Sequence, residues 1–171
     1  MDVETAIRTR RTHKAYGPEP VDRETLDELF ELARWAPNHH LTNPWRFRVV
    51  GPRAREALKR ATGDPVASAK LDRAPTLVVV SATQLNDDPL ANEEDVLATA
   101  VAAYVVLLAA HARGLAGYWR TPAVLRTDPG LTAVHVPYHE HVLGLLHLGR
   151  PRQEPRVPER APVDAIATYL D

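Results

Sequence analysis

The sequence predicts a single globular domain, residues 1–171, that contains both α-helices and β-strands. Its 171 residues are enough for one hydrophobic core and too few for two ordinary domains. Hydrophobic residues make up 44% and charged residues 25% of the chain, which is the composition of a folded globular protein. Apolar residues recur at helical spacing in some segments and form continuous β-branched runs in others, so we expect both kinds of element.

Charge and residue usage exclude several classes of function. A formal net charge of -1 gives no general attraction for nucleic acid or for an anionic membrane. The chain has no cysteine, which excludes disulfides, thiolate catalysis and iron–sulfur clusters and fits a cytoplasmic protein. The N-terminus lacks the apolar core of a secretory signal, and the longest apolar run, residues 96–110, is too short and too rich in alanine to span a bilayer. We therefore expect a soluble cytoplasmic protein.

Capping residues and prolines indicate where the helices begin and end. Asp2 and Asp22 are N-cap residues, and Pro37 ends the helix that begins at Asp22. The acidic residues 93–95 are expected in the first turn of a long alanine-rich helix, where they complement the helix dipole. Helices are predicted at residues 2–9, from 22 to before 37, at 53–62 and at 93–113, with two further helical turns within 123–134.

The strands and the C-terminal segment follow from the remaining pattern. Residues 76–82 form the clearest strand, a β-branched run of the kind that is buried on both faces. Four prolines from Arg150 to Pro162, with Pro162 included, exclude a helix and predict an extended arm, followed by a last turn or edge element. Strands are predicted at residues 47–50, 76–82, 117–122 and 141–148.

The segment Trp35–Phe47 joins a helix to a strand and is unusually rich in functional side chains. It contains two histidines, two asparagines, two tryptophans and two prolines. Binding residues concentrate in loops that are held between rigid elements, so we interpret this loop as one edge of a ligand site.

A compact cluster of cations and a hydroxyl occupies Arg10–Lys14. The cluster is interpreted either as a solvated basic turn or as a phosphate site, because guanidinium groups and a hydroxyl suit a dianion. No glycine-rich dinucleotide motif and no P-loop is present, so a bound nucleotide would need side-chain cations. The segments around Arg10 and Arg160 could supply them.

The histidines and serines do not support metal or triad chemistry. His135, His139, His141 and Glu140 lie close in sequence, but none forms the helical i, i+4 pair that a zinc hydrolase uses. The chain has two serines, and neither lies in a nucleophile elbow. We predict neither a metal ion nor a catalytic triad.

Five motifs follow one another along the chain: Arg-Arg-Thr near residue 11, Pro-Val before a helix, Ala-Pro followed by Asn-Pro-Trp-x-Phe, an acidic start to a long alanine-rich helix, and Gly-x-Trp-Arg-Thr. Together these motifs resemble the FMN-dependent nitroreductase family, in particular its compact single-domain NAD(P)H nitroreductase branch. Their order and spacing match the family over residues 4–170. The resemblance implies an α+β fold with a central mixed β-sheet flanked by helices, and a homodimer with FMN at the subunit interface and an extended C-terminal arm around the partner.

The resemblance also implies the site residues. The cations and the hydroxyl that would hold the phosphate of FMN are Arg10, Arg11, Thr12, Lys14 and Arg160. The loop residues that would border the flavin ring are Trp35, His39 and Asn43. The short strand that would approach the ring contributes Trp119, Arg120 and Thr121. Asn43 replaces a common glutamine, and Leu41, Pro122 and Pro158 also depart from the family pattern, which predicts a weaker affinity for FMN.

The implied activity is transfer of reducing equivalents from NADH or NADPH to an electron-poor small molecule, such as a nitroaromatic or a quinone, by a ping-pong mechanism. Flavin N5 carries the chemistry, so no side chain is predicted to be a catalytic acid. Two alternatives stay open at this point: a flavin-binding module or sensor without turnover, and a structural dimer without flavin.

Overall fold

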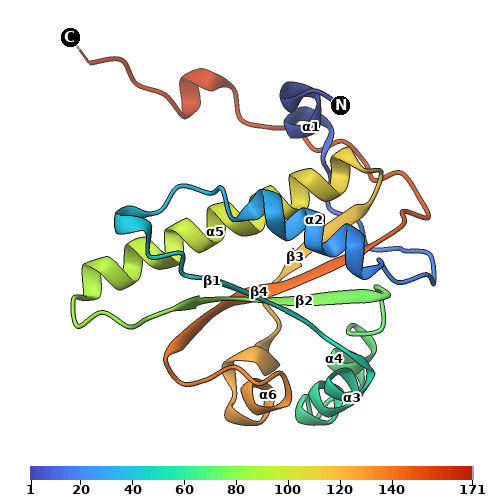
Figure 1. The fold of residues 1–171 in the computed structure, drawn as a ribbon. Helices are drawn as coiled ribbons and strands as arrows, with labels where there is room; N and C mark the ends of the chain where they lie inside the picture. The colour runs from blue at the N-terminus through green and yellow to red at the C-terminus, as the bar shows by residue number, and fades with distance from the viewer. Residues whose placement is uncertain (171) are drawn as a thin grey trace.

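The computed structural model describes residues 1–170 and is centred on a four-stranded β-sheet (Figure 1). The strands lie in the order β1-β2-β4-β3, and every neighbouring pair is antiparallel. Their bounds are β1 Trp45–Val49, β2 Thr76–Thr83, β3 Ala116–Arg120 and β4 Glu140–Gly149. The predicted α+β class is confirmed.

The expectation of a mixed sheet is wrong for the four strands of one chain. Within residues 1–170 the one parallel pairing is an isolated bridge between Thr12 and Gly117. The direction of a strand is not encoded in its apolar pattern, which fixes only the faces that its side chains occupy.

Strand β2 lies inside the sheet and is buried along its whole length. Its side chains alternate between two hydrophobic clusters, since successive residues of a strand point to opposite faces. Val78 and Val80 belong to one cluster, whereas Leu77 and Val79 belong to the other. The strand that was predicted to be buried on both faces is confirmed, and its apolar run is unbroken because each face packs into its own hydrophobic cluster.

Helices cover both faces of the sheet (Figure 1). Helices α2 (Arg23–Ala33) and α5 (Pro89–Ala112) lie on one face. Helices α3 (Pro52–Ala61), α4 (Pro65–Ala69) and α6 (Asp128–Ala133) lie on the other. Helix α1 (Val3–Thr9) contacts α5, where the Thr9 hydroxyl lies 2.8 Å from His111 Nε2. Single 3-10 turns occupy His39–Leu41, Ala123–Arg126 and Val163–Ala165.

The predicted caps of the first two helices are confirmed. The Asp2 carboxylate accepts a hydrogen bond from the Thr5 amide at 2.9 Å, and Asp22 accepts one from the Thr25 amide at 2.7 Å. No helix is predicted where α4 lies, because Gly63-Asp64-Pro65 has the pattern of a stop signal for the helix before it. Asp64 in fact caps a new helix by accepting hydrogen bonds from the amides of Val66 and Ala67.

Helix α5 begins one turn earlier than predicted. Pro89 is its first residue and Asp88 caps it, so the acidic residues 93–95 lie in the second turn rather than the first. The prediction failed because a proline in a polar stretch indicates a loop, yet proline is also favoured at the first helical position.

The apolar stretch predicted to be too short for a membrane span belongs to this longer helix. With 24 residues, α5 is long and apolar enough to cross a membrane by length and composition alone. Half of its most apolar window is buried inside the fold, which is the arrangement of a core helix.

The C-terminal arm is extended, as predicted. After Arg150 every residue up to position 170 is exposed except Pro155, which is half-buried. In Figure 1 the arm leaves the sheet, passes α1 and continues beyond the body of the fold. Its exposed apolar side chains are Val157, Val163, Ile166, Tyr169 and Leu170.

Candidate functional site

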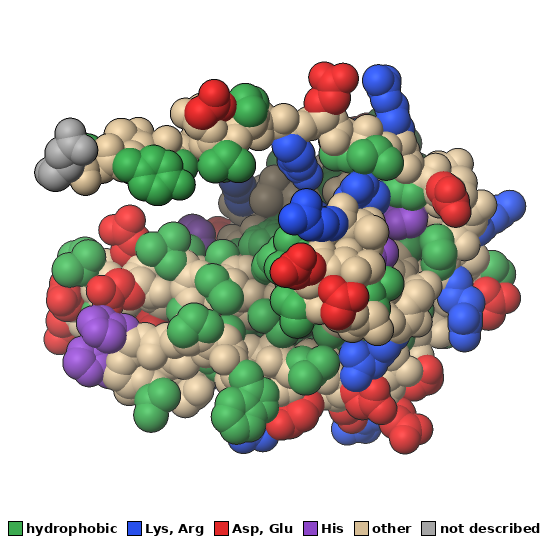
Figure 2. All heavy atoms as spheres, turned by 90° about the horizontal axis from the view of Figure 1, so that it is seen from above, with side chains coloured by type: hydrophobic (Ala, Val, Ile, Leu, Met, Phe, Trp, Pro, Cys, Tyr) green, Lys and Arg blue, Asp and Glu red, His purple; other side chains and the backbone are tan. Residues whose placement is uncertain are grey.

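Residues from the two ends of the chain line one cavity, which we call the basic pocket. The cavity has a volume of about 510 Å³, within the range of small-molecule sites. Figure 2 shows the hollow beneath the arm with Lys and Arg side chains around it. Its lining residues are Arg10, Arg11, Thr12, His13, Lys14, Gln153, Pro155, Arg156, Pro158 and Arg160. Five of the predicted site residues therefore come together here.

Backbone pairing holds the two segments of the basic pocket against each other. The His13 amide donates to the Gly117 carbonyl at 3.2 Å, which attaches the first segment to the start of β3. The Gly17 amide donates to the Arg150 carbonyl at 2.9 Å, so the chain that follows the cluster runs beside the beginning of the arm. The sheet and the arm thus fix where the cations lie.

The cations of the basic pocket have no acidic partners. No Asp or Glu lines the cavity, and within residues 1–170 none of its five arginines and lysines forms an ion pair. The Nε atoms of Arg10 and Arg11 are buried without a hydrogen-bond partner. Buried donors without partners are costly, so this cavity fits a phosphate or another anion with several acceptor oxygens.

Two of these arginines are nevertheless held in place. The Arg10 guanidinium lies over the ring of Tyr104 at 5.7 Å, in a cation–π contact with helix α5. Arg11 donates from one nitrogen to the carbonyls of Arg8 and Arg10, at 2.6 and 2.9 Å. These contacts orient both side chains before any ligand binds.

Burial and nearby positive charge both lower the pKa of two histidines at or near the basic pocket. The pKa of His13 lies below its usual value because its imidazole is partly buried and because Arg10 is close, although a backbone hydrogen bond with Gln153 opposes this shift. Burial, Arg10, His13 and Arg11 likewise lower the pKa of His111. The neutral form of both rings is favoured where no anion compensates the arginines.

The loop singled out by its composition adopts an unusual backbone, and we call residues 38–43 the strained loop. His40, Leu41 and Asn43 have φ angles of 51°, 53° and 47°, in the left-handed region that residues other than glycine seldom adopt. Three such residues in six store strain that neighbouring contacts must offset, which is typical of functional loops.

Hydrogen bonds fix the strained loop to itself and to the first turns of α5. The Asn43 amide donates to the Asn38 side chain at 2.9 Å. The Thr42 hydroxyl donates to Asp95 at 2.5 Å, and His39 Nδ1 lies 2.8 Å from a Glu94 oxygen. Asp95 is 4% exposed. Sequence reasoning missed its role, since its acidic neighbours suggested only a helix start.

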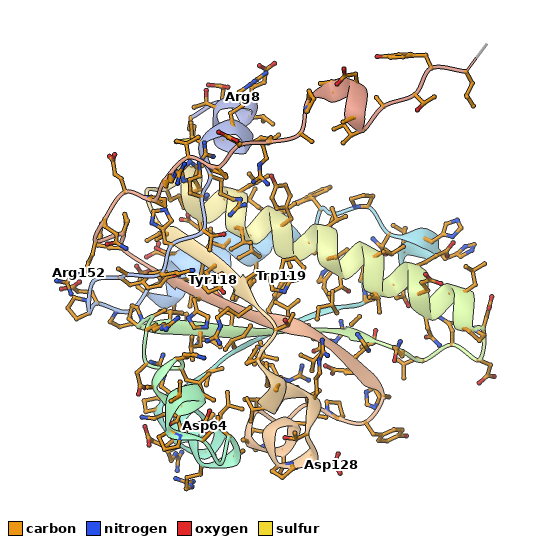
Figure 3. All side chains as sticks on the ribbon, turned by 180° about the vertical axis from the view of Figure 1, so that it is seen from behind. Arg8, Asp64, Tyr118, Trp119, Asp128 and Arg152 are labelled. Atoms are coloured by element: carbon orange, nitrogen blue, oxygen red, sulfur yellow. The ribbon has the colours of Figure 1, made fainter. Side chains whose placement is uncertain are left out.

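The third predicted group lies at the end of β3. Trp119 donates from Nε1 to the Leu143 carbonyl at 3.2 Å and packs against the core on the α5 face. Figure 3 shows it beside Tyr118 near the centre of the sheet. A Cβ on Gly144 would clash with the Trp119 ring and the Arg120 carbonyl, so only glycine fits there. Arg120 donates to the Lys70 carbonyl at 3.4 Å, and Thr121 is exposed.

One chain does not bring all the predicted residues together. Trp35, His39 and Asn43 lie outside the basic pocket. The Trp35 side chain is 76% exposed, with the Arg34 guanidinium over its ring. The strained loop contacts α5 at Glu94, whereas Arg10 contacts it at Tyr104. At 1.5 Å per residue these points are about 15 Å apart along the helix axis, and Figure 1 has the loop and α1 at opposite ends of α5.

Arg156 also lines the basic pocket and was not predicted. Its signal was present in the sequence, because side chains at alternate positions of an extended segment share a side and Arg156 lies four residues before Arg160. Within residues 1–170 no group of three or more His, Asp or Glu side chains could hold a metal ion.

Comparison with known proteins identifies relatives of this chain. Residues 7–70 match the model of the nitroreductase family, a range that includes the first segment of the basic pocket and the strained loop. A protein of Methanothermobacter thermautotrophicus named "Putative NADH dehydrogenase/NAD(P)H nitroreductase" is 30% identical, and the match covers 91% of this chain and 80% of that protein.

Solved structures share the fold. A nitroreductase-like family protein from Bacillus cereus superposes with a TM-score of 0.89 at 22% identity, covering 100% of this chain and 97% of that one. An FMN and NADPH-dependent nitroreductase from Sphigopyxis sp. strain HMH superposes with a TM-score of 0.83 at 17% identity, with 100% of both chains covered.

Proposed function

This chain belongs to the nitroreductase family, and we propose that it is an FMN-dependent oxidoreductase that transfers reducing equivalents from NAD(P)H to an electron-poor small molecule. A nitroaromatic or a quinone is the class of acceptor. For a quinone the balanced reaction is NAD(P)H, a proton and the quinone giving NAD(P)⁺ and the hydroquinone.

The observation that carries this proposal is the basic pocket. A phosphate monoester bears about -1.5 to -2 charges at neutral pH and three acceptor oxygens. The cavity offers unpaired cations, a Thr12 hydroxyl and buried guanidinium nitrogens that lack acceptors. We assign the FMN phosphate to Arg10, Thr12 and Arg160, with Arg11 and Lys14 contributing positive charge.

Bound FMN would supply the two-electron redox chemistry, taking a hydride from the nicotinamide and passing electrons to the acceptor. The chain's own residues would bind the cofactor and orient its ring. Arg120 carries a positive charge at the end of β3 and has a single hydrogen bond, at 3.4 Å. That bond joins it to the residue after α4, on the face of the sheet opposite to α5 and the basic pocket, so we assign it no contact with the ring in this conformation. The donor and the acceptor occupy the same space in turn, which gives the ping-pong order.

We propose that the site is completed by a second copy of the chain. Leu97, Val101 and Tyr104 form an apolar stripe on α5 and are 60%, 43% and 37% exposed. The arm adds five large exposed apolar side chains, and exposed apolar surface of this extent is typical of an interface. In a two-fold dimer, we expect Trp35 and the strained loop of one protomer to lie beside the pocket of its partner, so that Trp35, His39 and Asn43 border the flavin.

One spectrum followed by a titration tests the activity. Purified protein should be yellow, and NADPH added without oxygen should bleach the flavin band, which a quinone should then restore. Colourless protein that FMN does not stabilise against heat would contradict the proposal. Flavin that stays oxidised with both NADH and NADPH would instead indicate a binding module.

A further inference from the structure

We propose that His39 donates a proton to the electron acceptor, and that Glu94 of helix α5 is a positioning residue that holds the His39 ring. This assignment goes beyond the sequence, which predicts no catalytic acid. It rests on the proposed function, since it takes His39 to border the flavin of the partner protomer.

The proposed reaction consumes a proton that the reductant does not carry. Reduction of a quinone to a hydroquinone takes two electrons and two protons, and NAD(P)H supplies the two electrons with one proton as a hydride. The second proton must come from a group that can release it near neutral pH, as histidine can. Among the three residues proposed to border the flavin, Trp35, His39 and Asn43, only the histidine has this property.

The ring of His39 is held through one of its two nitrogens. His39 Nδ1 lies 2.8 Å from a Glu94 carboxylate oxygen. An ionised carboxylate only accepts hydrogen bonds, so Nδ1 carries a proton and donates it. The nitrogen left to gain and lose a proton is Nε2. The His39 side chain is 65% exposed, so the ring is accessible to a bound molecule. A carboxylate orients an imidazole and stabilises its charged form in the same way in a catalytic triad.

The backbone around His39 is fixed as well. Asp95, which follows Glu94 on α5, accepts a hydrogen bond from the Thr42 hydroxyl, so two consecutive acids hold the strained loop. The His40 ring stacks on the His39 ring with the centroids 4.5 Å apart, and the φ angle of His40 is 51°. An exposed ion pair contributes little to stability by itself. We therefore assign the contact between His39 and Glu94 to the orientation of the ring.

The proposed step breaks one N–H bond and forms one O–H bond. As the hydride equivalent reaches the quinone, the proton on His39 Nε2 passes to a quinone oxygen, and the electron pair of the N–H bond stays on the nitrogen. The ring is then neutral, keeps its Nδ1 proton on Glu94, and takes up a proton from water before the next turnover. Over one turnover, NAD(P)H, a proton and the quinone give NAD(P)⁺ and the hydroquinone.

The experiment compares an acceptor that needs a proton with one that does not. The flavin-loaded protein is reduced with an equimolar amount of NADPH without oxygen and mixed rapidly with benzoquinone or with ferricyanide, which takes electrons alone. Reappearance of the oxidised flavin band gives a rate for each acceptor, normalised to bound flavin. In His39→Asn the benzoquinone rate should fall by about 100-fold, the contribution of a general acid, while the ferricyanide rate stays unchanged.

A second variant leaves the His39 ring in place. Glu94→Gln removes the negative charge that holds the ring, so the benzoquinone rate should fall by a smaller factor, about fivefold, and the ferricyanide rate should not fall. Glu93→Gln is the matched control, because Glu93 is the preceding residue of α5 and is exposed. His141→Asn, at an exposed position of β4 outside the proposed site, controls for the loss of an imidazole. Both controls should keep both rates.

Nitrogen-15 NMR of the histidine rings gives a readout that needs no turnover. At about pH 8.5 an ordinary imidazole is neutral, and the spectrum shows which nitrogen carries its proton. His39→Asn identifies the His39 signals by their loss. In the wild type the proton should lie on Nδ1, and this preference should weaken in Glu94→Gln but not in Glu93→Gln.

Three results would overturn the inference. Equal losses with both acceptors in His39→Asn would mean that His39 shapes the flavin site and donates no proton. An unchanged benzoquinone rate in this variant would mean that water supplies the proton. A proton on Nε2 in the wild type would remove the contact with Glu94. If His39→Asn does not fold, the same comparison in Glu94→Gln decides.

Failure of the proposed function gives a different result. Protein that never holds FMN, or whose flavin NADPH does not reduce, removes the proposed function and this inference together. Flavin that is reduced by NADPH and reoxidised by ferricyanide supports the proposed function, and unchanged benzoquinone rates in both variants then remove this inference alone.

Discussion

The basic pocket and the strained loop satisfy their polar groups in opposite ways. The pocket leaves guanidinium nitrogens of Arg10 and Arg11 buried without acceptors. The loop has protein partners, since the Asn38 side chain accepts from the Asn43 amide and Asp95 of α5 accepts from the Thr42 hydroxyl. The pocket is therefore shaped to be completed by a ligand, while the loop is fixed in advance in a strained form. A ligand site shared by two protomers, as proposed, needs both a region that binds the ligand and a rigid region that borders it. The basic pocket and the strained loop provide these two regions at opposite ends of α5.

The largest effect should come from removing the two arginines of the first phosphate position. Arg10→Gln combined with Arg160→Gln deletes two charge-assisted contacts worth about 1.5–3 kcal/mol each. FMN affinity should fall by 100-fold or more, measured by the flavin retained after gel filtration and by fluorescence titration.

Arg152→Gln, on the same arm but outside the basic pocket, is the control for loss of charge, and it should keep its flavin. A double variant that stays yellow and fully loaded would mean that the phosphate lies elsewhere.

The proposed sharing of the site between two copies can be tested by complementation. One variant carries Arg10→Gln and Arg160→Gln, and the other carries His39→Ala and Asn43→Ala. Each alone should have little activity. Co-expressed chains that pair at random should recover about a quarter of the wild-type activity, because half of the dimers regain one of two sites.

If the strained loop served its own chain, mixed dimers would contain no complete site and activity would not return. Wild-type chains co-expressed under the same conditions give the reference activity, and gel filtration should record the dimer in every case.

A smaller effect is expected from releasing the strained loop. Asp95→Ala leaves the Thr42 hydroxyl without its partner and should lower the free energy of unfolding by about 1–3 kcal/mol. At this chain length each kcal/mol lowers Tm by about 2–4 °C. Calorimetry measures the change, with Asp87→Ala, an exposed aspartate in the loop before α5, as the control.

Thr42→Val and the Thr42→Val, Asp95→Ala double variant complete a double-mutant cycle. Coupling well above zero is expected for this buried contact. Strictly additive losses would mean that Asp95 does not hold the loop.

The smallest effect concerns pH. In the free pocket the pKa of His13 is lowered by burial and by Arg10, and a bound phosphate dianion should raise it again. Binding then takes up a proton, so FMN affinity should increase as the pH falls through the range below 6.5, by less than tenfold. Flavin binding measured from pH 5 to 8 checks this, and His13→Asn should flatten the profile.

A second histidine limits how far the pH can be lowered. His147 is fully buried, and burial and nearby arginines lower its pKa to about 3. The unfolded chain binds a proton there near pH 6.5 while the folded chain does not, so stability is complete above that pH and decreases as the pH falls toward 3. An affinity that dropped in parallel with stability would report unfolding rather than His13.

Much of the fold was predictable because local chemistry dictates it. Asp2 and Asp22 cap helices through hydrogen bonds to residues three positions later, and the apolar run of β2 reflects burial on both faces. The errors occurred where one residue has two uses. Pro89 stands in a polar stretch typical of a loop but starts α5, and Asp64 stands in a Gly-Asp-Pro sequence typical of a helix stop but caps α4.

The site was predictable in part for a different reason. Arg10–Lys14 are neighbours in sequence, so their charge cluster is visible without a structure. The role of Asp95 depends on a contact with Thr42 across 53 positions, and that of Arg156 on the path of the arm. Contacts at such separation leave no local pattern in a single sequence.

The joining of both chain ends in the basic pocket has a consequence for biosynthesis. Arg160 leaves the ribosome 150 residues after Arg10, which at ordinary rates of translation is a delay of roughly 8–30 s. During this interval the N-terminal arginines have no arm beside them. With the phosphate site proposed above, we expect cofactor loading to wait for nearly complete synthesis, and we predict that a chain truncated before the arm does not retain flavin.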